Sequence, residues 1–290
     1  MKYLQYGIHD DNALEGLQEI EDIEKVILSP LKRLNSLLGM VTESKPESIP
    51  GFVANLESKF ESLVSKDYVE LKQIDIEERI DGLPNLKGYP KVAKLSVNYV
   101  LEGLALPDDV DWFSEKLEVT KRVYLRSLLS ARYHYILTLT ETIDRTEAIE
   151  IYKKHFEKVN REWVAENKER FQNLEEFFED KSKRDPENPG WVGLVSEVEE
   201  GKVLIRTDSC LWADAMVDYP DSELKFLVCC YGDYTSIKIS NKHFELTMEH
   251  SIAGGHGYCD CVVHDTRIND SLDHPSDEFF ANLSPSKEPE

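Results

Sequence analysis

The spacing of apolar residues changes near residue 181, and this change limits the folds that the chain can adopt. Upstream, apolar residues recur three and four positions apart, as in helices that bury one face. Downstream, short β-branched segments alternate with glycine-containing turns, which is typical of strands and hairpins. The charged segment Lys181–Gly190 separates the two patterns. We therefore predict an α+β fold, with a mostly helical N-terminal region and a small antiparallel sheet with short helices at the C-terminal end.

The helical pattern is clearest from Arg145 to Asp180, where Ile149, Tyr152 and Phe156 begin an apolar stripe. Such a stripe is more typical of core packing than of a cofactor site, and it leaves open a scaffold role for this helix. The predicted helices span Ala13–Met40, Gly51–Ser65, Val92–Leu104, Asp109–Thr140 and Arg145–Asp180, with a turn-rich loop at Asp81–Pro90.

The strand pattern begins with a hairpin candidate, Trp191–Val198 and Lys202–Thr207. The remaining predicted elements are the short helices Leu211–Asp218 and Ser222–Cys230 and the strands Phe244–Glu249 and Tyr258–His264. After Arg267 the chain becomes acidic and rich in Ser, Pro and Asn. We therefore predict a helical region at 1–183, an α+β unit at 190–267 and a disordered acidic tail at 268–290.

The balance of charge argues against two classes of partner. The 34 basic and 56 acidic residues give a formal charge of −22, which repels phosphate backbones and anionic lipids. We therefore predict no nucleic-acid and no membrane partner. No apolar run approaches the roughly 20 residues of a membrane span, and Met1–Asn12 does not resemble a signal peptide. The odd number of cysteines and the adjacent Cys229 and Cys230 indicate free thiols and a cytoplasmic protein. The expected partner is a small-molecule substrate, and the helix from Arg145 to Asp180 leaves open a homo-oligomer.

The residues able to carry chemistry gather in one segment. All five cysteines lie between Cys210 and Cys261, and the same part of the chain contains His243, His250, His256 and His264. Thiols and imidazoles attack electrophilic carbon, move protons and bind soft metals. The structural alternative is that the cysteines fill space in a reduced core.

Three motifs in this segment resemble the L-2-amino-thiazoline-4-carboxylic acid hydrolase family. They are CLWA at Cys210–Ala213, CYGD at Cys230–Asp233 and SIAGGHGYCDC at Ser251–Cys261. A looser match lies upstream at Arg132–Ile136. The resemblance covers the second half of the chain and implies an enzyme that opens a small cyclic amidine thioether, in a family with many members in natural-product pathways.

Two departures from the family pattern lie beside the expected site. Cys261 replaces an aromatic residue, and His256 stands where an acidic residue is common. These departures predict a substrate that differs from the family's namesake.

The residues support hydrolysis by a cysteine nucleophile without a cofactor. A thiolate at Cys210, Cys230 or Cys259 can attack the amidine carbon of a thiazoline. Cys230 is the preferred nucleophile, because Asp233 follows at a spacing that lets it orient a histidine or a water.

Further residues are candidates for moving protons and binding the substrate. His250 and His256 flank the glycine-rich loop and are candidate proton carriers. For a substrate carboxylate, the candidates are the guanidinium groups of Arg206 and Arg132 and the backbone N–H groups at Gly254 and Gly255. Asp260 completes the predicted substrate-binding set.

Other functions use the same residues. Cys210, Cys230 and Cys259 form an alternative tetrahedral zinc site, although the usual Cys-x-x-Cys pairs are missing. The α+β unit also suits a ligand- or zinc-binding sensor without catalysis, or a natural-product cyclase. The sequence contains no basic recognition helix and no P-loop for a sensor's output, which favours the enzyme.

Overall fold

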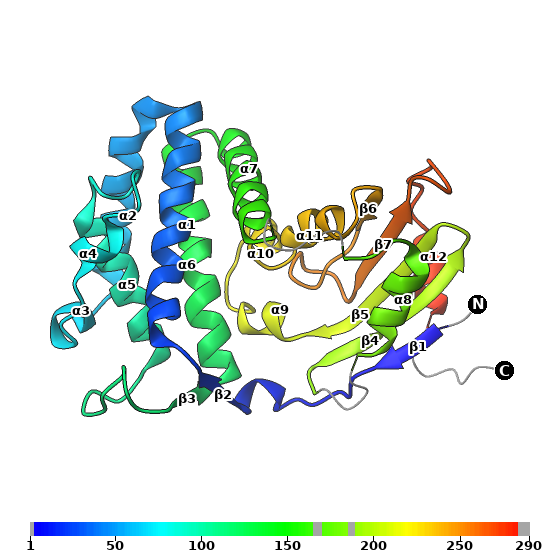
Figure 1. Cartoon of the computed structure of the whole chain (residues 1–290), viewed down its shortest axis with the longest axis horizontal. Coiled ribbons are helices and arrows are strands. Elements are labelled where there is room, and N and C mark those ends of the chain that lie inside the picture. Colours follow the sequence, from blue (N-terminus) through cyan, green and yellow to red (C-terminus); the bar gives the residue numbers. More distant parts are fainter. Residues whose placement is uncertain (1–2, 165–169, 185–188, 284–290) are drawn as a thin grey trace. The chain divides into compact units, whose positions relative to one another are not determined.

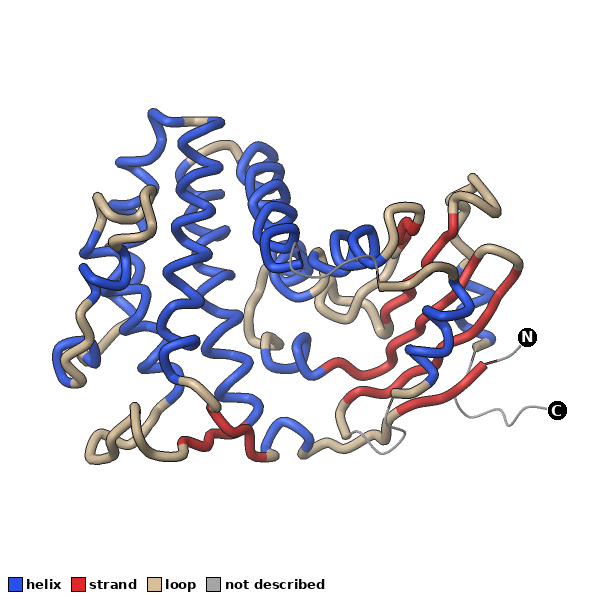
Figure 2. The backbone as a smooth tube through the Cα atoms, in the orientation of Figure 1, coloured by secondary structure: helices blue, strands red, loops and turns tan. Residues whose placement is uncertain are grey.

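The computed structural model describes residues 3–164, 170–184 and 189–283, and the chain divides into two compact units. The helical unit comprises Glu15–Val159. The sheet unit comprises Met1–Leu14 and Asn160–Glu290 and contains a five-stranded antiparallel sheet (Figures 1 and 2). The predicted α+β fold, with helices first and a small antiparallel sheet toward the C-terminus, is confirmed.

The helical unit is built around long amphipathic helices. Its helices are α1 (Ile23–Ser44), η2 (Pro46–Ser48), α2 (Ile49–Leu63), α3 (Tyr68–Leu71), α4 (Ile76–Ile80), α5 (Pro90–Leu104), α6 (Lys121–Thr142) and most of α7 (Arg145–Val164). The apolar face of α1 is fully buried at Ile27, Leu31 and Leu34, because these residues share one side of the helix. No described helix is long and apolar enough to cross a membrane.

Two predicted helices begin later than the sequence pattern suggested. The segment expected to start a helix at Ala13 contains η1 (Ala13–Glu15) and the strand β2 (Leu17–Ile20) before α1. The helix expected from Asp109 starts at Lys121, after the strand β3 (Leu117–Thr120). These two strands pair antiparallel, with Ile20 opposite Leu117, and both of these residues are buried. A strand of four residues is too short for its alternation to be distinguished from a helical pattern.

The helix predicted from Arg145 to Asp180 is not continuous in the described residues. α7 ends at Val164 and α8 spans Leu174–Ser182, while residues 165–169 lie outside the description. α8 has its own start, because the Asn173 side chain accepts a hydrogen bond from the backbone N–H of Glu176. Residues 160–183, predicted to lie in the helical region, belong to the sheet unit.

The sheet has the strand order β1-β4-β5-β7-β6. The strands are β1 (Tyr3–Tyr6), β4 (Trp191–Glu199), β5 (Lys202–Cys210), β6 (Phe244–Thr247) and β7 (Cys259–Asp265), and the helices of this unit include α9 (Leu211–Ala215), α10 (Ser222–Cys229) and α11 (Gly232–Ser240). The hairpin predicted at Trp191–Thr207 forms as β4 and β5. The sequence pattern did not indicate α11, which begins directly after α10.

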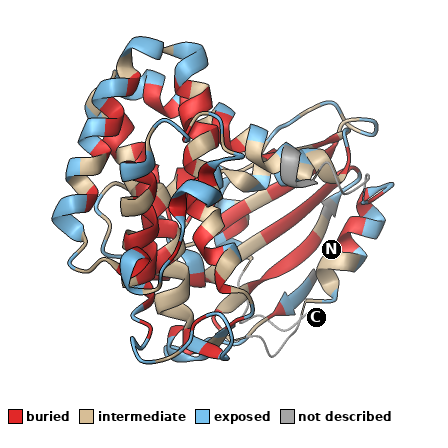
Figure 3. Cartoon of the chain, turned by 60° about the vertical axis from the view of Figure 1, so that its left-hand side comes forward, coloured by how far each residue is buried: buried red, intermediate tan, exposed pale blue. Residues whose placement is uncertain are grey.

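Side chains alternate between the two faces of this sheet. The inner face, which packs against α8 and α11, buries Val195, Val203 and Val263. The outer face buries Leu194, Leu204 and Val262 beneath α12 (Asp277–Asn282). Figure 3 shows this burial along the strands as red bands. Both faces are therefore covered, and the central strands β4, β5 and β7 contribute to both cores.

The C-terminal segment takes part in the outer core. The sequence pattern predicted disorder from residue 268, whereas the structure forms α12 and buries Phe280 completely. The Phe280 ring stacks on His274 and on Tyr258, with centroids 5.3 and 6.0 Å away. One well-placed aromatic residue thus anchors an otherwise polar segment, which average composition does not reveal. Residues 284–290 lie outside the description.

Candidate functional site

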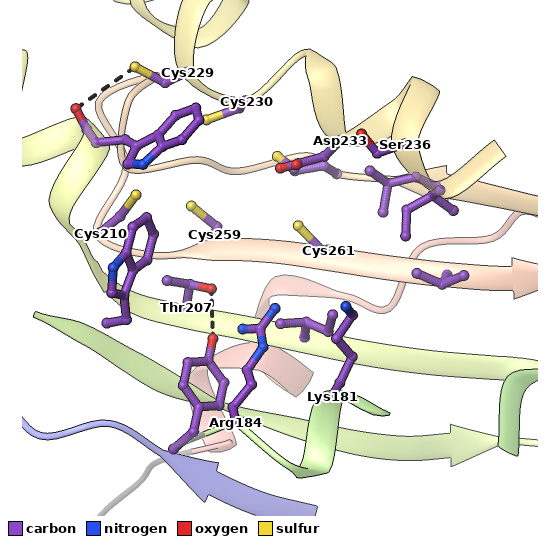
Figure 4. Close-up of a pocket in the computed structure, with 18 of the residues that line it drawn as sticks. Lys181, Arg184, Thr207, Cys210, Cys229, Cys230, Asp233, Ser236, Cys259 and Cys261 are labelled. Atoms are coloured by element: carbon purple, nitrogen blue, oxygen red, sulfur yellow. Dashed lines mark hydrogen bonds between the residues drawn. The ribbon is translucent and has the colours of Figure 1, made fainter. Parts of the chain in front are cut away.

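A cavity of about 550 Å³ lies on the inner face of the sheet. All five cysteines line it, and the sulfur atoms of Cys210, Cys230, Cys259 and Cys261 surround the same space, whereas the Cys229 thiol donates to the carbonyl oxygen of Trp212 (Figure 4). Cys210 ends β5, Cys229 ends α10 and Cys230 follows it, and Cys259 and Cys261 lie on β7. The fold therefore brings together three segments that are far apart along the sequence.

Burial keeps four of the cavity thiols, those of Cys210, Cys230, Cys259 and Cys261, protonated. Removal from bulk water raises the pKa of Cys210 to about 12 and that of Cys259 to about 11. Burial also raises the pKa of Cys230 and Cys261, and the charges of neighbouring acidic groups raise it further. Cys259 Sγ accepts a hydrogen bond from the backbone N–H of Ile252 at 3.3 Å, which favours its thiolate, and the backbone N–H groups of Ala213 and Trp212 act in the same direction on Cys210. A nucleophilic thiol in this cavity needs a base.

Asp233 is a carboxylate among these thiols. The turn between α10 and α11 places it there, because its N–H donates to the carbonyl oxygen of Cys230 at 2.9 Å. Asp233 is exposed to solvent through the cavity, which it lines beside the cysteines (Figure 4). The cavity walls replace much of the surrounding water and raise the pKa of its carboxyl to about 6, although the charges of Arg184 and Lys181 oppose this. Asp233 can thus exchange a proton near neutral pH.

Two cations that the sequence analysis did not select also line the cavity. Arg184 lies over the ring of Tyr6, with its guanidinium carbon 4.6 Å from the ring centroid. Lys181 belongs to α8 and pairs with Asp180 at 3.1 Å. No carboxylate in the described part of the chain lies within ion-pair distance of Arg184. Both cations come from the charged segment Lys181–Gly190, which the sequence analysis interpreted as a break between two patterns. The clustering of basic residues there was the only sequence signal for a role in binding.

Other cavity residues had no signal in the sequence. Tyr6 reaches the site because β1 pairs with β4, and its hydroxyl lies 3.0 Å from Thr207 Oγ1. Trp191 and Trp212 add aromatic walls. A strand pairing across almost 190 residues cannot be deduced from local patterns.

The arginines predicted to bind a carboxylate lie elsewhere. Arg206 alternates with Ile205 and Thr207 on β5, so it points to the outer face. There its guanidinium donates to Asp208 Oδ1 at 2.8 Å and to the carbonyl oxygens of Phe280 and Leu283. Arg132 lies on α6 in the helical unit and does not line the cavity.

The predicted residues His250 and Asp260 also do not line the cavity. Asp260 lies between Cys259 and Cys261, so its side chain points to the outer face. Its Oδ1 accepts the backbone N–H groups of Glu249 and His250 at 2.9 and 2.8 Å, and its Oδ2 accepts His250 Nδ1–H at 2.7 Å. This arrangement lowers the pKa of Asp260 and raises that of His250.

The glycine-rich loop is held by its own hydrogen bonds. Gly254 N–H donates to Ser251 Oγ at 2.9 Å, and Gly255 has a φ of +99°, which glycine adopts without strain. His256 packs against His250, with ring centroids 4.7 Å apart. His256 and these two glycines are not part of the cavity wall.

The zinc alternative requires several ligands to converge. Across residues 3–164, 170–184 and 189–283, no group of three or more His, Cys, Asp or Glu side chains has a metal-binding arrangement. Cys210, Cys230 and Cys259 share the cavity but do not form a ready tetrahedral site.

The sequence match agrees with the location of the cavity. Residues 125–263 match the L-2-amino-thiazoline-4-carboxylic acid hydrolase family. The predicted family resemblance is confirmed. The matched range contains 18 of the 19 residues that line the cavity, every one except Tyr6. The family's name suggests a hydrolase-like domain. No curated protein and no solved structure matches the chain.

Proposed function

We propose that the cavity binds a small cyclic substrate of the 2-aminothiazoline-carboxylate type and hydrolyses it through a cysteine nucleophile. The observation that carries this proposal is the presence of Asp233 among buried thiols, with the Arg184 guanidinium in the same cavity. The thiols supply a nucleophile, Asp233 a base, and Arg184 a site for the substrate carboxylate. The reaction consumes only water.

Cys259 is the thiol best suited to attack. Its pKa is raised to about 11, against about 12 for Cys210, and the Ile252 N–H already points at its sulfur. We therefore assign Cys259 as nucleophile in place of Cys230, because burial opposes the Cys230 thiolate more strongly.

The proposed reaction has two steps. Asp233 takes the thiol proton as Cys259 Sγ bonds to the amidine carbon, and the ring C–S bond then breaks while the ring sulfur receives that proton. Water next adds to the enzyme-bound carbon, and the bond to Cys259 Sγ breaks as the thiol regains a proton. The product is an open-chain ureido acid with a free thiol, which equals the substrate plus one water.

The test is turnover of synthetic 2-aminothiazoline-4-carboxylate, followed by mass spectrometry of the product and of the intact protein. We expect Asp233→Asn to lower kcat by about 10²–10⁴-fold, the usual range for a general base. Cys259→Ala removes both turnover and the covalent adduct. The matched control is Glu245→Gln, which changes a surface carboxylate that pairs with Lys238.

Three results would contradict the proposal. Full activity of Asp233→Asn shows that this carboxylate is not the base. A covalent adduct that persists in Cys259→Ala but disappears in Cys230→Ala would identify Cys230 as the nucleophile. Absence of turnover by the wild-type protein with every cyclic amidine offered excludes the reaction class.

A further inference from the structure

Four residues form a row across the inner face of the sheet. Tyr6 on β1 pairs with Gly193 on β4. On β5, Thr207 pairs with Gly193 on one side and with Cys259 of β7 on the other. Tyr6, Thr207 and Cys259 all line the cavity. The row therefore crosses the cavity floor from an edge strand of the sheet to the nucleophile assigned above.

Gly193 leaves room for the Tyr6 side chain to extend along this row. A Cβ atom at residue 193 would lie 2.6 Å from the Tyr6 hydroxyl oxygen and 2.1 Å from the carbonyl oxygen of Arg206, and both distances are too short for a side chain. Glycine permits such close approach because it has no Cβ. The Tyr6 side chain thus lies over β4, and its hydroxyl reaches Thr207 Oγ1 at 3.0 Å.

The Thr207 hydroxyl is close to the Cys259 thiol. Residues directly opposite each other in an antiparallel pair have Cβ atoms about 4.5–5.5 Å apart on the same face. Thr207 and Cys259 are such a pair, and both side chains reach the cavity. A ligand group bound at the two hydroxyls therefore lies roughly one strand spacing, about 5 Å, from the sulfur atom.

The two hydroxyls can offer a hydrogen to a ligand. They carry two hydrogens, and the bond between them uses one, whichever of the two residues is the donor. Among the described residues, the Tyr6 hydroxyl has a second acceptor in the carbonyl oxygen of Arg206, at a long distance of 3.5 Å. A charged acceptor in the cavity would make a stronger hydrogen bond than this contact.

The guanidinium of Arg184 adds a positive charge beside the hydroxyls. Its central carbon lies 4.6 Å from the centroid of the Tyr6 ring, and Figure 4 shows the group directed toward Thr207 and the thiols. Burial raises the pKa of Tyr6, although the charge of Arg184 and hydrogen bonds with Thr207 and Arg184 oppose this. The Tyr6 hydroxyl is therefore protonated at neutral pH. A guanidinium with neighbouring hydroxyl donors suits a carboxylate, whose two oxygens accept several hydrogen bonds.

We propose, on the basis of the function proposed above, that Tyr6 and Thr207 bind the substrate carboxylate together with Arg184. The carboxylate then lies over β5 and the amidine carbon lies at Cys259 Sγ, so the substrate crosses the strands. The hydroxyl pair determines specificity, because an uncharged group in place of the carboxylate would leave the guanidinium and the free hydrogen without a partner. Tyr6 lies outside the residues that match the family, so this contact depends on the pairing of β1 with β4.

The test uses two alkylating probes that differ in charge. Iodoacetate carries a carboxylate beside the carbon that a thiolate attacks, and iodoacetamide is its uncharged counterpart. Peptide mass spectrometry measures both rates at Cys259 in the full-length protein, and the urea-unfolded chain gives their ratio without a binding site. We expect the ratio of the iodoacetate rate to the iodoacetamide rate to be at least about tenfold higher in the folded protein, since hydrogen bonds to a charged group are worth about that factor. Equal ratios overturn the proposal.

Substitutions identify the groups responsible for this preference. The double variant Tyr6→Phe/Thr207→Val removes both hydroxyls and nearly preserves side-chain size. It is expected to lower the ratio at Cys259 by about tenfold, with the iodoacetamide rate unchanged within twofold, whereas a purely structural role would change both rates together. The matched control is Tyr234→Phe, because the Tyr234 hydroxyl donates to the carbonyl oxygen of Met248 at 3.3 Å and does not line the cavity.

Two further outcomes decide the role of the hydroxyl pair. A ratio that stays high in the double variant overturns the proposal and leaves the carboxylate to Arg184 alone. If the double variant does not fold, the single variants Tyr6→Phe and Thr207→Val decide in the same way, each with an expected loss of about threefold.

These measurements separate the two proposals, since alkylation does not depend on turnover. A preference for iodoacetate that the double variant loses, without turnover of any cyclic amidine, supports the carboxylate site and contradicts the proposed hydrolysis. Turnover of the cyclic substrate with equal alkylation ratios in the folded and unfolded protein contradicts the carboxylate site alone.

Discussion

Adjacent residues of β7 lie in contrasting surroundings on the two faces of the sheet. On the outer face, Asp260 is almost fully buried and accepts three hydrogen bonds from Glu249 and His250. On the inner face, the Cys261 thiol and the Asp233 carboxylate have no hydrogen-bond partner among the residues that the structure describes. The carboxylate of Asp260 is thus satisfied by the protein itself. The inner groups are left for a ligand, which is the pattern expected when one face stabilises the fold and the other reacts.

The largest expected effect concerns the outer face. Phe280→Ala should lower the free energy of unfolding by about 3–5 kcal/mol, because it removes a fully buried ring from the core beneath α12. Phe279 is only partly buried, so Phe279→Ala is the matched control with a smaller loss. Urea denaturation of both variants measures the difference. Equal, small losses would show that the C-terminal segment does not hold the outer face.

Replacing the carboxylates of Asp260 and Asp233 should change the free energy of unfolding in different directions. Asp260→Asn should destabilise the protein by about 2–3 kcal/mol, because charge-assisted hydrogen bonds are lost inside the fold. Asp233→Asn should leave the stability unchanged or raise it, since the folded state disfavours the charge and raises the pKa of this carboxyl. Urea denaturation at pH 7 tests both variants. A large loss for Asp233→Asn would make it a structural residue.

The sequence predicted the parts of the fold that depend on local patterns. The hairpin of β4 and β5 and the helices α2 and α5 follow from apolar spacing and from Pro and Gly at their ends. The pattern did not predict the β2–β3 pairing, since it joins residues that are distant along the chain. The anchoring of the tail by Phe280 also depends on a partner far along the chain.

The candidate site was predictable to a similar extent. Clustering pointed to the cysteines and Asp233, which do share one cavity. It did not indicate that Cys259 and Asp260 point to opposite faces of the sheet, because the face of each residue depends on the register of β7 with β5. Arg206 was chosen by residue type alone, whereas Arg184 reaches the cavity through tertiary packing.

The thiols on the inner face should react slowly but unequally. Cys259 has a pKa about one unit below that of Cys210, so its thiolate is roughly tenfold more abundant at any pH below both values. Lower basicity reduces thiolate reactivity, which leaves an expected ratio of labelling rates of about three to ten. Iodoacetamide labelling with peptide mass spectrometry measures it, and the urea-unfolded chain is the control with equal rates. Faster labelling of Cys210 than of Cys259 would contradict the lower pKa assigned to Cys259.

The smallest expected effect is a pH dependence with opposite signs in two regions. On the outer face, His250 gains a carboxylate partner, and its pKa is raised above 6.5. Its stabilising contribution is therefore complete below pH 6.5 and is lost as the pH rises through the folded-state value. The partner Asp260 has a lowered pKa, so its own contribution is present above pH 3.8 and is lost as the pH falls through its folded-state value. The pair stabilises most between these limits.

In the helical unit, His155 has the reverse behaviour. Its ring is buried against Ser36, with Nδ1 3.1 Å from Oγ, and burial lowers its pKa to about 3. The unfolded chain binds this proton more readily, so stability is lost as the pH falls below 6.5. Unfolding free energies at pH 5 and pH 8 should therefore show that His250→Gln costs more at pH 5, whereas His155→Gln costs more at pH 8. The same sign for both variants would mean that the Asp260 pairing does not hold His250 in its charged form.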